Sequence, residues 1–264
     1  DWGAFGEVIL GDGTTDRADV VIGADGIGSL TRRLLLPGIA PTYAGYVAWR
    51  GMVHESRLSA ETVDSFCDTL SSYQGPETSI LLYEVPGEDG SLEPGGRRIN
   101  WVWYENMPVG PRLSRLMTDN KGYEHRSTVA RNEMTDETRL YLERLAHAEL
   151  SQPFREVVLN TTEPFVQKIE DLTIPRLVFG RVVLIGDAAS LVRPHIGSGT
   201  AKAVDDAIHL AMALSVRCDE DLSCLAAWED TRLNDHFGLA EYAKAIARRL
   251  KLGDDTKDDT ARTV

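Results

Sequence analysis

The spacing of apolar and polar residues divides the chain into short strands interspersed with longer helices. Uniformly apolar runs at 20–22 and 182–185 predict strands, and the run at 182–185 is typical of a strand that is buried on both faces. Apolar residues recur at helical spacing in three segments, 135–150, 200–214 and 225–250. Further strands are predicted at 45–53, 80–85, 99–104 and 165–169, and residues 7–10 and 18–22 flank Gly11-Asp12-Gly13 as a β-hairpin. This mixture predicts an α/β (α+β) fold.

A first motif follows the strand at 182–185. Gly186 and Asp187 end this strand, and a loop with Pro194, Gly197 and Gly199 leads into the next helix. Open α/β sheets bind ligands at the carboxyl ends of their strands, and a helix N-terminus attracts negative charge. An ionised carboxylate accepts hydrogen bonds from hydroxyls. The order therefore indicates a site for an anionic ligand with hydroxyls, and an ordinary strand–turn–helix is the alternative. Apolar residues recur at helical spacing along this helix, namely Ala203, Ala207, Leu210, Ala211 and Leu214.

A second motif, Asp25-Gly26-x-x-Ser29-x-x-Arg32, follows the strand at 20–22, with Ser29 as a candidate N-cap. The two motifs, in this order and separated by strand-rich sequence, resemble those of class A FAD-dependent aromatic monooxygenases, which have the para-hydroxybenzoate hydroxylase-like fold. Similarity to the 2,6-dihydroxypyridine 3-hydroxylase-like branch rests on four shorter segments, 41–51, 100–104, 193–195 and 201–203.

The resemblance implies a discontinuous FAD-binding Rossmann-like domain, residues 1–38 and 176–252, with an inserted mainly β substrate domain at 39–175. Members of the family open with a strand, a Gly-x-Gly-x-x-Gly turn and a helix that hold the ADP part of FAD. This sequence shows no such unit, so we expect an N-terminal truncation, an incomplete FAD domain and poor FAD binding by this chain alone. The polar tail at 253–264 is expected to be disordered.

The resemblance also implies roles for individual residues. The cofactor-binding residues would be Asp25, Gly26, Arg32, Gly186, Asp187, Pro194, Gly197, Ser198, Gly199, Thr200 and Ala201. Pro194 and His195 would flank the reacting edge of the flavin, with His195 as a proton relay or, alternatively, a histidine that anchors the loop. Ser190, Ala201 and Lys202 depart from the wider family, which usually has His and Asn at the first two positions, so backbone N–H groups or Lys202 would compensate.

Aromatic and basic residues of the inserted segment are the candidates for substrate binding. Trp101 and Trp103 would share one face of a strand, where they either line a ring pocket or pack between the sheet and helices. The same two alternatives apply to Tyr46, Trp49 and Arg50, and Arg50 would pair with a substrate oxyanion or with a structural acid.

The implied activity is NAD(P)H-dependent hydroxylation of an electron-rich aromatic or pyridine-type ring by O₂, through a C4a-hydroperoxyflavin. A related epoxidase, halogenase or reductase, or a non-catalytic fragment, remains an alternative. The formal net charge of −13 argues against nucleic-acid binding, and no apolar run is long enough to span a membrane. We expect no metal site, three reduced cysteines and a cytoplasmic location, with a homodimer as the oligomeric state to test.

Overall fold

The computed structural model describes residues 6–75, 78–215 and 222–253, and the chain divides into two compact units. Unit 1 comprises Asp1–Tyr43 and Glu170–Ile246, and unit 2 comprises Ala44–Ile169 and Ala247–Val264. The sequence placed residues 247–252 with the first of these, but Ala247 and Leu252 pack against Tyr46 and Tyr104 in the core of unit 2. The end of the chain therefore follows its apolar contacts and belongs to unit 2.

Unit 1 contains a hairpin and a small mixed sheet. Strand β1 (Gly6–Ile9) pairs antiparallel with β2 (Thr15–Ala18), whereas β3 (Val21–Gly23) pairs in parallel with β11 (Val182–Leu184). Strand β10 (Val178–Phe179) lies on the other side of β11, so the order is β10-β11-β3. The predicted hairpin was thus wrong in its second strand, because residues 21–23 leave the hairpin and pair with β11 instead.

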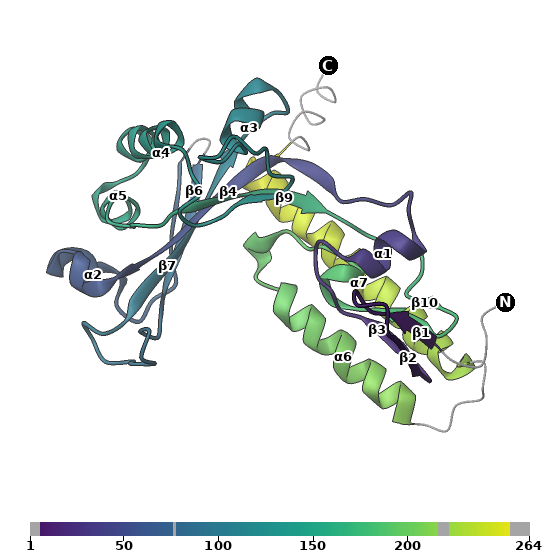
Figure 1. Cartoon of the computed structure of the whole chain (residues 1–264). Coiled ribbons are helices and arrows are strands. Elements are labelled where there is room, and N and C mark those ends of the chain that lie inside the picture. Colours follow the sequence, from purple (N-terminus) through teal and green to yellow (C-terminus); the bar gives the residue numbers. More distant parts are fainter. Residues whose placement is uncertain (1–5, 76–77, 216–221, 254–264) are drawn as a thin grey trace, which may run out of the picture. The chain divides into compact units, whose positions relative to one another are not determined.

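The helices of unit 1 are α1 (Leu30–Leu35), α6 (Gly199–Ser215) and α7 (Ala226–Arg249) up to Ile246, drawn beside its strands in Figure 1. Short 3₁₀ turns occur at Gly186–Ala188, Pro194–Ile196 and Ser223–Leu225. The predicted stripe of α6 holds for Leu210, but the other buried residues of this helix are charged, namely Lys202 and Asp206. Ala207 and Ala211 are exposed. The buried face of α6 is therefore partly charged rather than wholly apolar, and each of the two buried charges requires a partner.

Unit 2 is built on a six-stranded sheet in the order β5-β6-β7-β4-β9-β8. Its centre is a long antiparallel pair in which Trp49 lies opposite Trp103 and Arg50 opposite Val102. The strands are β4 (Thr42–His54), β5 (Ser71–Gln74), β6 (Thr78–Val85), β7 (Arg98–Asn106), β8 (Thr128–Val129) and β9 (Phe165–Asp171). The strands predicted at 45–53, 80–85, 99–104 and 165–169 are confirmed.

Helices α4 (Asp136–Glu149) and α5 (Gln152–Leu159) lie beside this sheet, as Figure 1 shows. Thr135 caps α4 by accepting a hydrogen bond from the Thr138 N–H group, which confirms the predicted start of this helix. Proline suits the first turn of a helix, and Pro153 lies in the first turn of α5, so it does more than end the segment before it. The remaining helical elements are α2 (Ala60–Phe66), α3 (Pro111–Leu116) and the 3₁₀ turn Glu55–Arg57.

Three further expectations concern the cysteines, the tail and the membrane. Cys67 is exposed and free, but Cys224 is disulfide-bonded, which corrects the prediction of a reduced thiol there; Cys218 lies outside the described residues. The predicted tail also lies outside them apart from Gly253, whose N–H group donates to Asn106 Oδ1 at 2.8 Å. Within the described ranges, no helix is long and apolar enough to cross a bilayer.

Candidate FAD site

The two motif loops emerge side by side from adjacent parallel strands. Asp25 and Gly26 follow β3, Gly186 and Asp187 follow β11, and both loops therefore begin at the carboxyl end of the sheet. The Ile185 N–H group donates to the Gly23 carbonyl at 3.1 Å, which continues the strand pairing up to the loops. This edge is where open α/β sheets place ligands, so the fold brings together the two motifs that the sequence separates by more than a hundred residues.

Arg32 ties one motif loop to the other. Its side chain is buried, with Nη1 donating to the Ala188 carbonyl at 2.9 Å and Nη2 donating to the Ile27 carbonyl at 2.7 Å. A guanidinium offers five N–H donors in a fixed plane, which suits several carbonyls at once. The sequence proposed Arg32 as a direct cofactor contact, but the structure gives it main-chain carbonyls on both loops. Arg32 therefore holds the loops together.

Asp25 organises the start of α1. Its carboxylate accepts from Ser29 Oγ at 2.5 Å and from the Thr31 N–H group at 2.9 Å, and Ser29 Oγ in turn accepts from the Arg32 N–H group. Partial burial alone would raise the pKa of Asp25, but these hydrogen bonds outweigh it and lower the pKa below its usual value. The predicted N-cap at Ser29 is confirmed, and Asp25 carries an ionised carboxylate in the first motif loop.

Asp187 is the exposed acid of the second loop. Gly186 before it has φ +60°, a conformation that favours glycine, and its amide is buried. In the part of the chain that the structure describes, no hydrogen bond to the Asp187 carboxylate is found, and the side chain faces solvent. A carboxylate held by a fixed turn and left open can accept hydrogen bonds from the hydroxyls of a ligand.

Arg193 and His195 both anchor the loop from Arg193 to Gly197. Arg193 is buried and pairs with both Asp171 carboxylate oxygens, at 2.6 and 2.9 Å. His195 Nε2 donates to the Ala243 carbonyl of α7 at 2.9 Å, and burial lowers the pKa of its imidazole. Because the ring is neutral and its Nε2–H group donates to a carbonyl, the loop-anchoring alternative for His195 is favoured over the proton relay. Gly197 then ends the Pro194–Ile196 turn at φ +66°.

Four glycines in and near the two motif loops have open space beside them. A Cβ atom added at Gly26, Gly28, Gly197 or Gly199 would meet no other atom within 4 Å. Helix α6 starts at Gly199, with exposed Thr200 and Ala201 and half-buried Ser198 around its first turn. The first N–H groups of a helix lack partners inside the helix. Exposed main chain, an unshielded helix start and the Asp187 carboxylate together fit the ribityl chain and the anionic edge of a flavin.

The three tryptophans of unit 2 lie in its core. Trp49, Trp101 and Trp103 are at most 1% exposed. Their indole N–H groups donate to Glu105 Oε2, Thr161 Oγ1 and Thr78 Oγ1, respectively. All three side chains are therefore satisfied within the protein. Of the two alternatives stated for them, this placement favours packing between the sheet and its helices.

Tyr46 and Arg50 project from the opposite face of β4. Tyr46 is fully buried, with its ring 5.9 Å from that of Tyr104. Arg50 is half-buried, donates to Gln167 Oε1 at 3.2 Å and lies 5.9 Å from the centre of the Phe165 ring. Among the described residues, Arg50 forms no ion pair with a carboxylate. Of the two alternatives stated for Arg50, the structural acid is not found.

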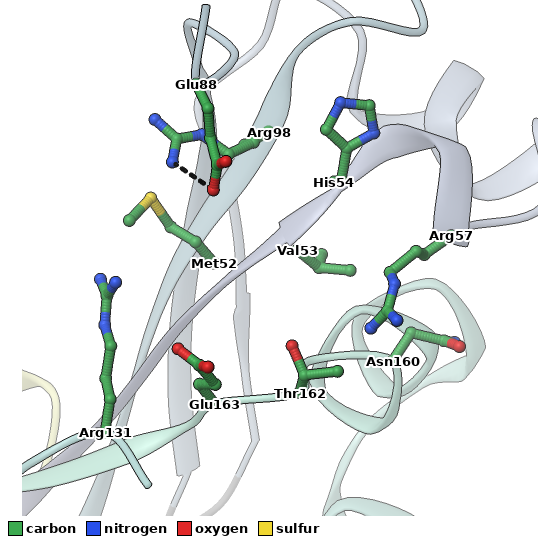
Figure 2. Close-up of a pocket in the computed structure, with 10 residues that line it drawn as sticks. All are labelled: Met52, Val53, His54, Arg57, Glu88, Arg98, Arg131, Asn160, Thr162 and Glu163. Atoms are coloured by element: carbon green, nitrogen blue, oxygen red, sulfur yellow. Dashed lines mark ion pairs between the residues drawn. The ribbon is translucent and has the colours of Figure 1, made fainter.

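Unit 2 also contains a cavity of about 230 Å³, drawn in Figure 2. Arg57, Arg98, Arg131 and His54 give it a mainly basic lining. Glu88 offsets part of this charge, because it lies 3.7 Å from Arg98, as the dashed line in Figure 2 marks. None of the five predicted substrate residues lines this cavity.

Another cluster on unit 2 was missed by the sequence. Ligand atoms of Asp119, His125 and Glu133 lie within 4.8 Å of one another. Asp119 Oδ1 accepts the N–H groups of Lys121 and Tyr123, while Oδ2 pairs with His125 Nε2 at 2.9 Å. These contacts lower the pKa of Asp119, the His125 hydrogen bond being the largest cause, and they fasten the surrounding loop.

Sequence reasoning also missed the charges beneath the Asp187 turn. Asp206 Oδ2 accepts the Gly186 N–H group at 2.9 Å, and Lys202 Nζ donates to the Gly186 carbonyl at 2.8 Å. On α7, Arg232 Nε and His236 Nε2 donate to Asp206 Oδ1 at 2.9 and 2.8 Å. The signal was a lysine and an aspartate four residues apart, in phase with Leu210, because residues at that spacing share a helix face.

Comparison with known proteins supports an FAD-binding fold independently of the geometry. A family described as FAD binding domain-like matches residues 43–171. The chain is 38% identical over 242 residues to 2,6-dihydroxypyridine 3-monooxygenase of Paenarthrobacter nicotinovorans, covering 92% of this chain and 59% of that protein. It is 31% identical to salicylate hydroxylase of Pseudomonas putida, covering 79% of this chain and 46% of that one.

A solved structure, 2,6-dihydroxypyridine-3-hydroxylase from Arthrobacter nicotinovorans, superimposes with a TM-score of 0.87 at 36% identity. The match covers 94% of this chain and 61% of that one, so the chain spans about half to three fifths of the length of these relatives. The shared fold, the paired motif loops and the sequence identity together show that the chain belongs to the class A FAD-dependent aromatic monooxygenases.

Proposed function

We propose that the protein carrying this chain hydroxylates an electron-rich aromatic or N-heteroaromatic ring, using FAD, NAD(P)H and O₂. The overall reaction would combine the ring, O₂, NAD(P)H and a proton to give the hydroxylated ring, water and NAD(P)⁺. The observation that carries this proposal is the pairing of the Asp25 and Asp187 loops at the carboxyl ends of two parallel strands. The aromatic substrates in the names of the relatives support the same reaction class.

FAD, when bound and reduced, would supply the activation of O₂ for transfer of one oxygen atom to the ring. The residues of this chain would bind and orient it. Asp187 would accept hydrogen bonds from ribityl hydroxyls, and the first N–H groups of α6 would face the pyrimidine edge of the flavin, where negative charge is favourable. Arg32 would keep the two loops in register through its hydrogen bond to Ala188.

The loop that carries Pro194 would flank the reacting edge of the flavin. We propose that His195 fixes this loop by its hydrogen bond to Ala243, rather than moving protons itself. The burial that lowers the pKa of His195 keeps the ring neutral at pH 7, so its N–H group remains a donor to the carbonyl. A fixed loop is useful because a positioned wall excludes water from the reacting centre.

Arg50 is our proposal for the substrate contact. It is half-buried without a carboxylate partner among the described residues, and a guanidinium binds oxyanions through paired N–H donors. A phenolate or carboxylate on the ring would satisfy it. Tyr46, in the same face of the strand, would form apolar support rather than a direct polar contact.

Two experiments test the proposed function. Titration of FAD into the purified protein that carries this chain, rather than into the chain alone, tests cofactor binding through quenching of flavin fluorescence. NAD(P)H oxidation with dihydroxypyridine, salicylate and aminohydroxybenzoate, followed by mass spectrometry of the products, tests the reaction. We expect saturable binding and a product that has gained one oxygen atom. NAD(P)H oxidation without an oxygenated product would contradict a hydroxylase, and a halogenated or epoxidised product would identify a related flavoenzyme instead.

Oligomeric state and location are further proposals. We propose a homodimer that works in the cytoplasm. Size-exclusion chromatography with light scattering tests the first statement, and a monomer would contradict it. Cell fractionation tests the second, and recovery of the protein outside the cytoplasmic fraction would contradict it.

A further inference from the structure

We infer that Lys202 and Asp206 form a two-sided clamp on the Gly186 peptide groups, which positions the Asp187 carboxylate relative to the start of α6. The inference rests on the proposed FAD site, and it names two positioning residues that the proposed function does not need as direct contacts.

The geometry of the clamp is specific. Gly186 donates its N–H group to Asp206 Oδ2 at 2.9 Å and accepts from Lys202 Nζ through its carbonyl at 2.8 Å. The two side chains stand one turn apart on α6, and both are at most 1% exposed. The backbone of Gly186 therefore has its donor and its acceptor fastened to the same helix. Because Asp187 is the next residue, the clamp sets where its carboxylate lies.

Both charged side chains of the clamp are buried, and burial changes the pKa of each. Burial lowers the pKa of Lys202, opposed by the nearby carboxylates of Asp206 and Asp187. Burial by itself raises the pKa of Asp206, but hydrogen bonds from His236 and from the Gly186 N–H group lower it overall. Lys202 Nζ and Asp206 Oδ2 lie 3.8 Å apart. A buried charge is stable only when it is paired and hydrogen-bonded, so each member of the pair requires the other.

A second helix holds the clamp in place. Arg232 and His236 of α7 both donate to Asp206 Oδ1, which leaves Oδ2 for Gly186. Helix α6 cannot rotate or slide without breaking these contacts. The Asp187 turn and the first turn of α6 are therefore held as one rigid group, and these are the two elements proposed to contact the flavin.

The test uses Lys202→Met, which keeps the length and apolar stem but removes the ammonium, with Lys202→Gln as a second variant that retains an N–H donor. Lys244→Met is the matched control, because Lys244 lies in the same unit and pairs with Glu241 on the surface. Circular dichroism and a thermal melt show whether each variant folds.

Hydrogen–deuterium exchange across residues 184–192 is measured first, without FAD. We expect the turn amides of Lys202→Met to exchange about tenfold faster or more, with Lys202→Gln in between and Lys244→Met unchanged. FAD titration should then show affinity weakened by about tenfold for Lys202→Met alone. Unchanged exchange would overturn the clamp, and changed exchange with unchanged FAD affinity would overturn its role in positioning. If the wild type bound no FAD while exchange changed, the clamp would stand and the proposed function would fail.

Discussion

The loops of unit 1 and the tryptophans of unit 2 are held in place by different means, although unit 2 also buries an ion pair between Arg97 and Glu55. Unit 1 fixes its loops with buried charges, since Arg32 and the Lys202–Asp206 pair bind main-chain groups and Arg193 binds the Asp171 carboxylate. Unit 2 fixes its sheet with buried aromatic rings, whose N–H groups are satisfied by single side-chain acceptors. Buried charges give directional hold at a high cost when one partner is lost, whereas aromatic packing gives stability with less direction. The cofactor loops use the directional means.

Trp101→Ala is the variant with the largest expected effect and tests the aromatic side of this comparison. It removes a fully buried ring and leaves Thr161 Oγ1 without its indole donor, so unit 2 should lose about 3–5 kcal/mol of unfolding free energy. Denaturant unfolding measures the loss, and hydrogen exchange assigns it to a unit. Equal loss of protection in unit 1 would show that the two units are not separately stabilised.

Arg32→Met tests the charged side. It leaves the Ala188 and Ile27 carbonyls without their donor, and we expect a loss of about 2–3 kcal/mol in unit 1. The loops should separate, so FAD affinity should fall as well. Arg33→Met, the exposed neighbour on the same helix, is the control. If both variants behave alike, Arg32 does not join the motifs.

Arg50→Met sharpens the difference in function between the units. Because Arg50 is proposed to bind a substrate oxyanion, KM for a phenolic substrate should rise about tenfold, roughly 1.4 kcal/mol, with little change in FAD affinity. Arg57→Met is the control, because Arg57 is an exposed arginine at the end of a 3₁₀ turn in the same unit. A change in FAD affinity with unchanged KM would reverse the assignment.

His195→Gln should give the smallest effect and depends on pH. The pKa of His195 is lowered in the folded protein from 6.5, so below about pH 6.5 the unfolded chain binds the proton more readily than the folded one. Stability of the wild type should therefore fall as pH drops from 6.5 towards the folded pKa, and this slope should be smaller in the variant. Melts from pH 7.5 to 5 measure this slope, and an identical slope in both proteins would contradict the lowered pKa of the half-buried His195 ring.

Regular patterns in the sequence predicted much of this fold. The strand predicted at 182–185 is β11, and the helix predicted at 135–150 is α4. Both were predictable because an element that buries one or both faces has a regular pattern of apolar residues in its sequence. Ser29 was predicted as an N-cap because a cap depends on residues that are only three positions apart in the sequence. Local rules were sufficient wherever the partners are neighbours in the sequence.

The site was predicted less completely, because its decisive contacts join distant residues. Arg32 reaches Ala188 and Lys202 reaches Gly186, and no periodicity shows which carbonyl a buried cation will meet. The inward direction of Lys202 and Asp206 contradicted the usual rule that charges face water, and only pairing explains it. The tryptophans were ambiguous for another reason, since a core and a ring pocket need the same apolar face.

The most direct test of the account is FAD titration of Asp187→Asn beside Asp205→Asn. Both aspartates are exposed and lie in unit 1, but only Asp187 stands at the end of β11. The account predicts that Asp187→Asn weakens FAD binding by about tenfold, roughly 1.4 kcal/mol, while Asp205→Asn binds like the wild type. Equal affinity in all three proteins would contradict the claim that the paired motif loops of unit 1 hold the cofactor.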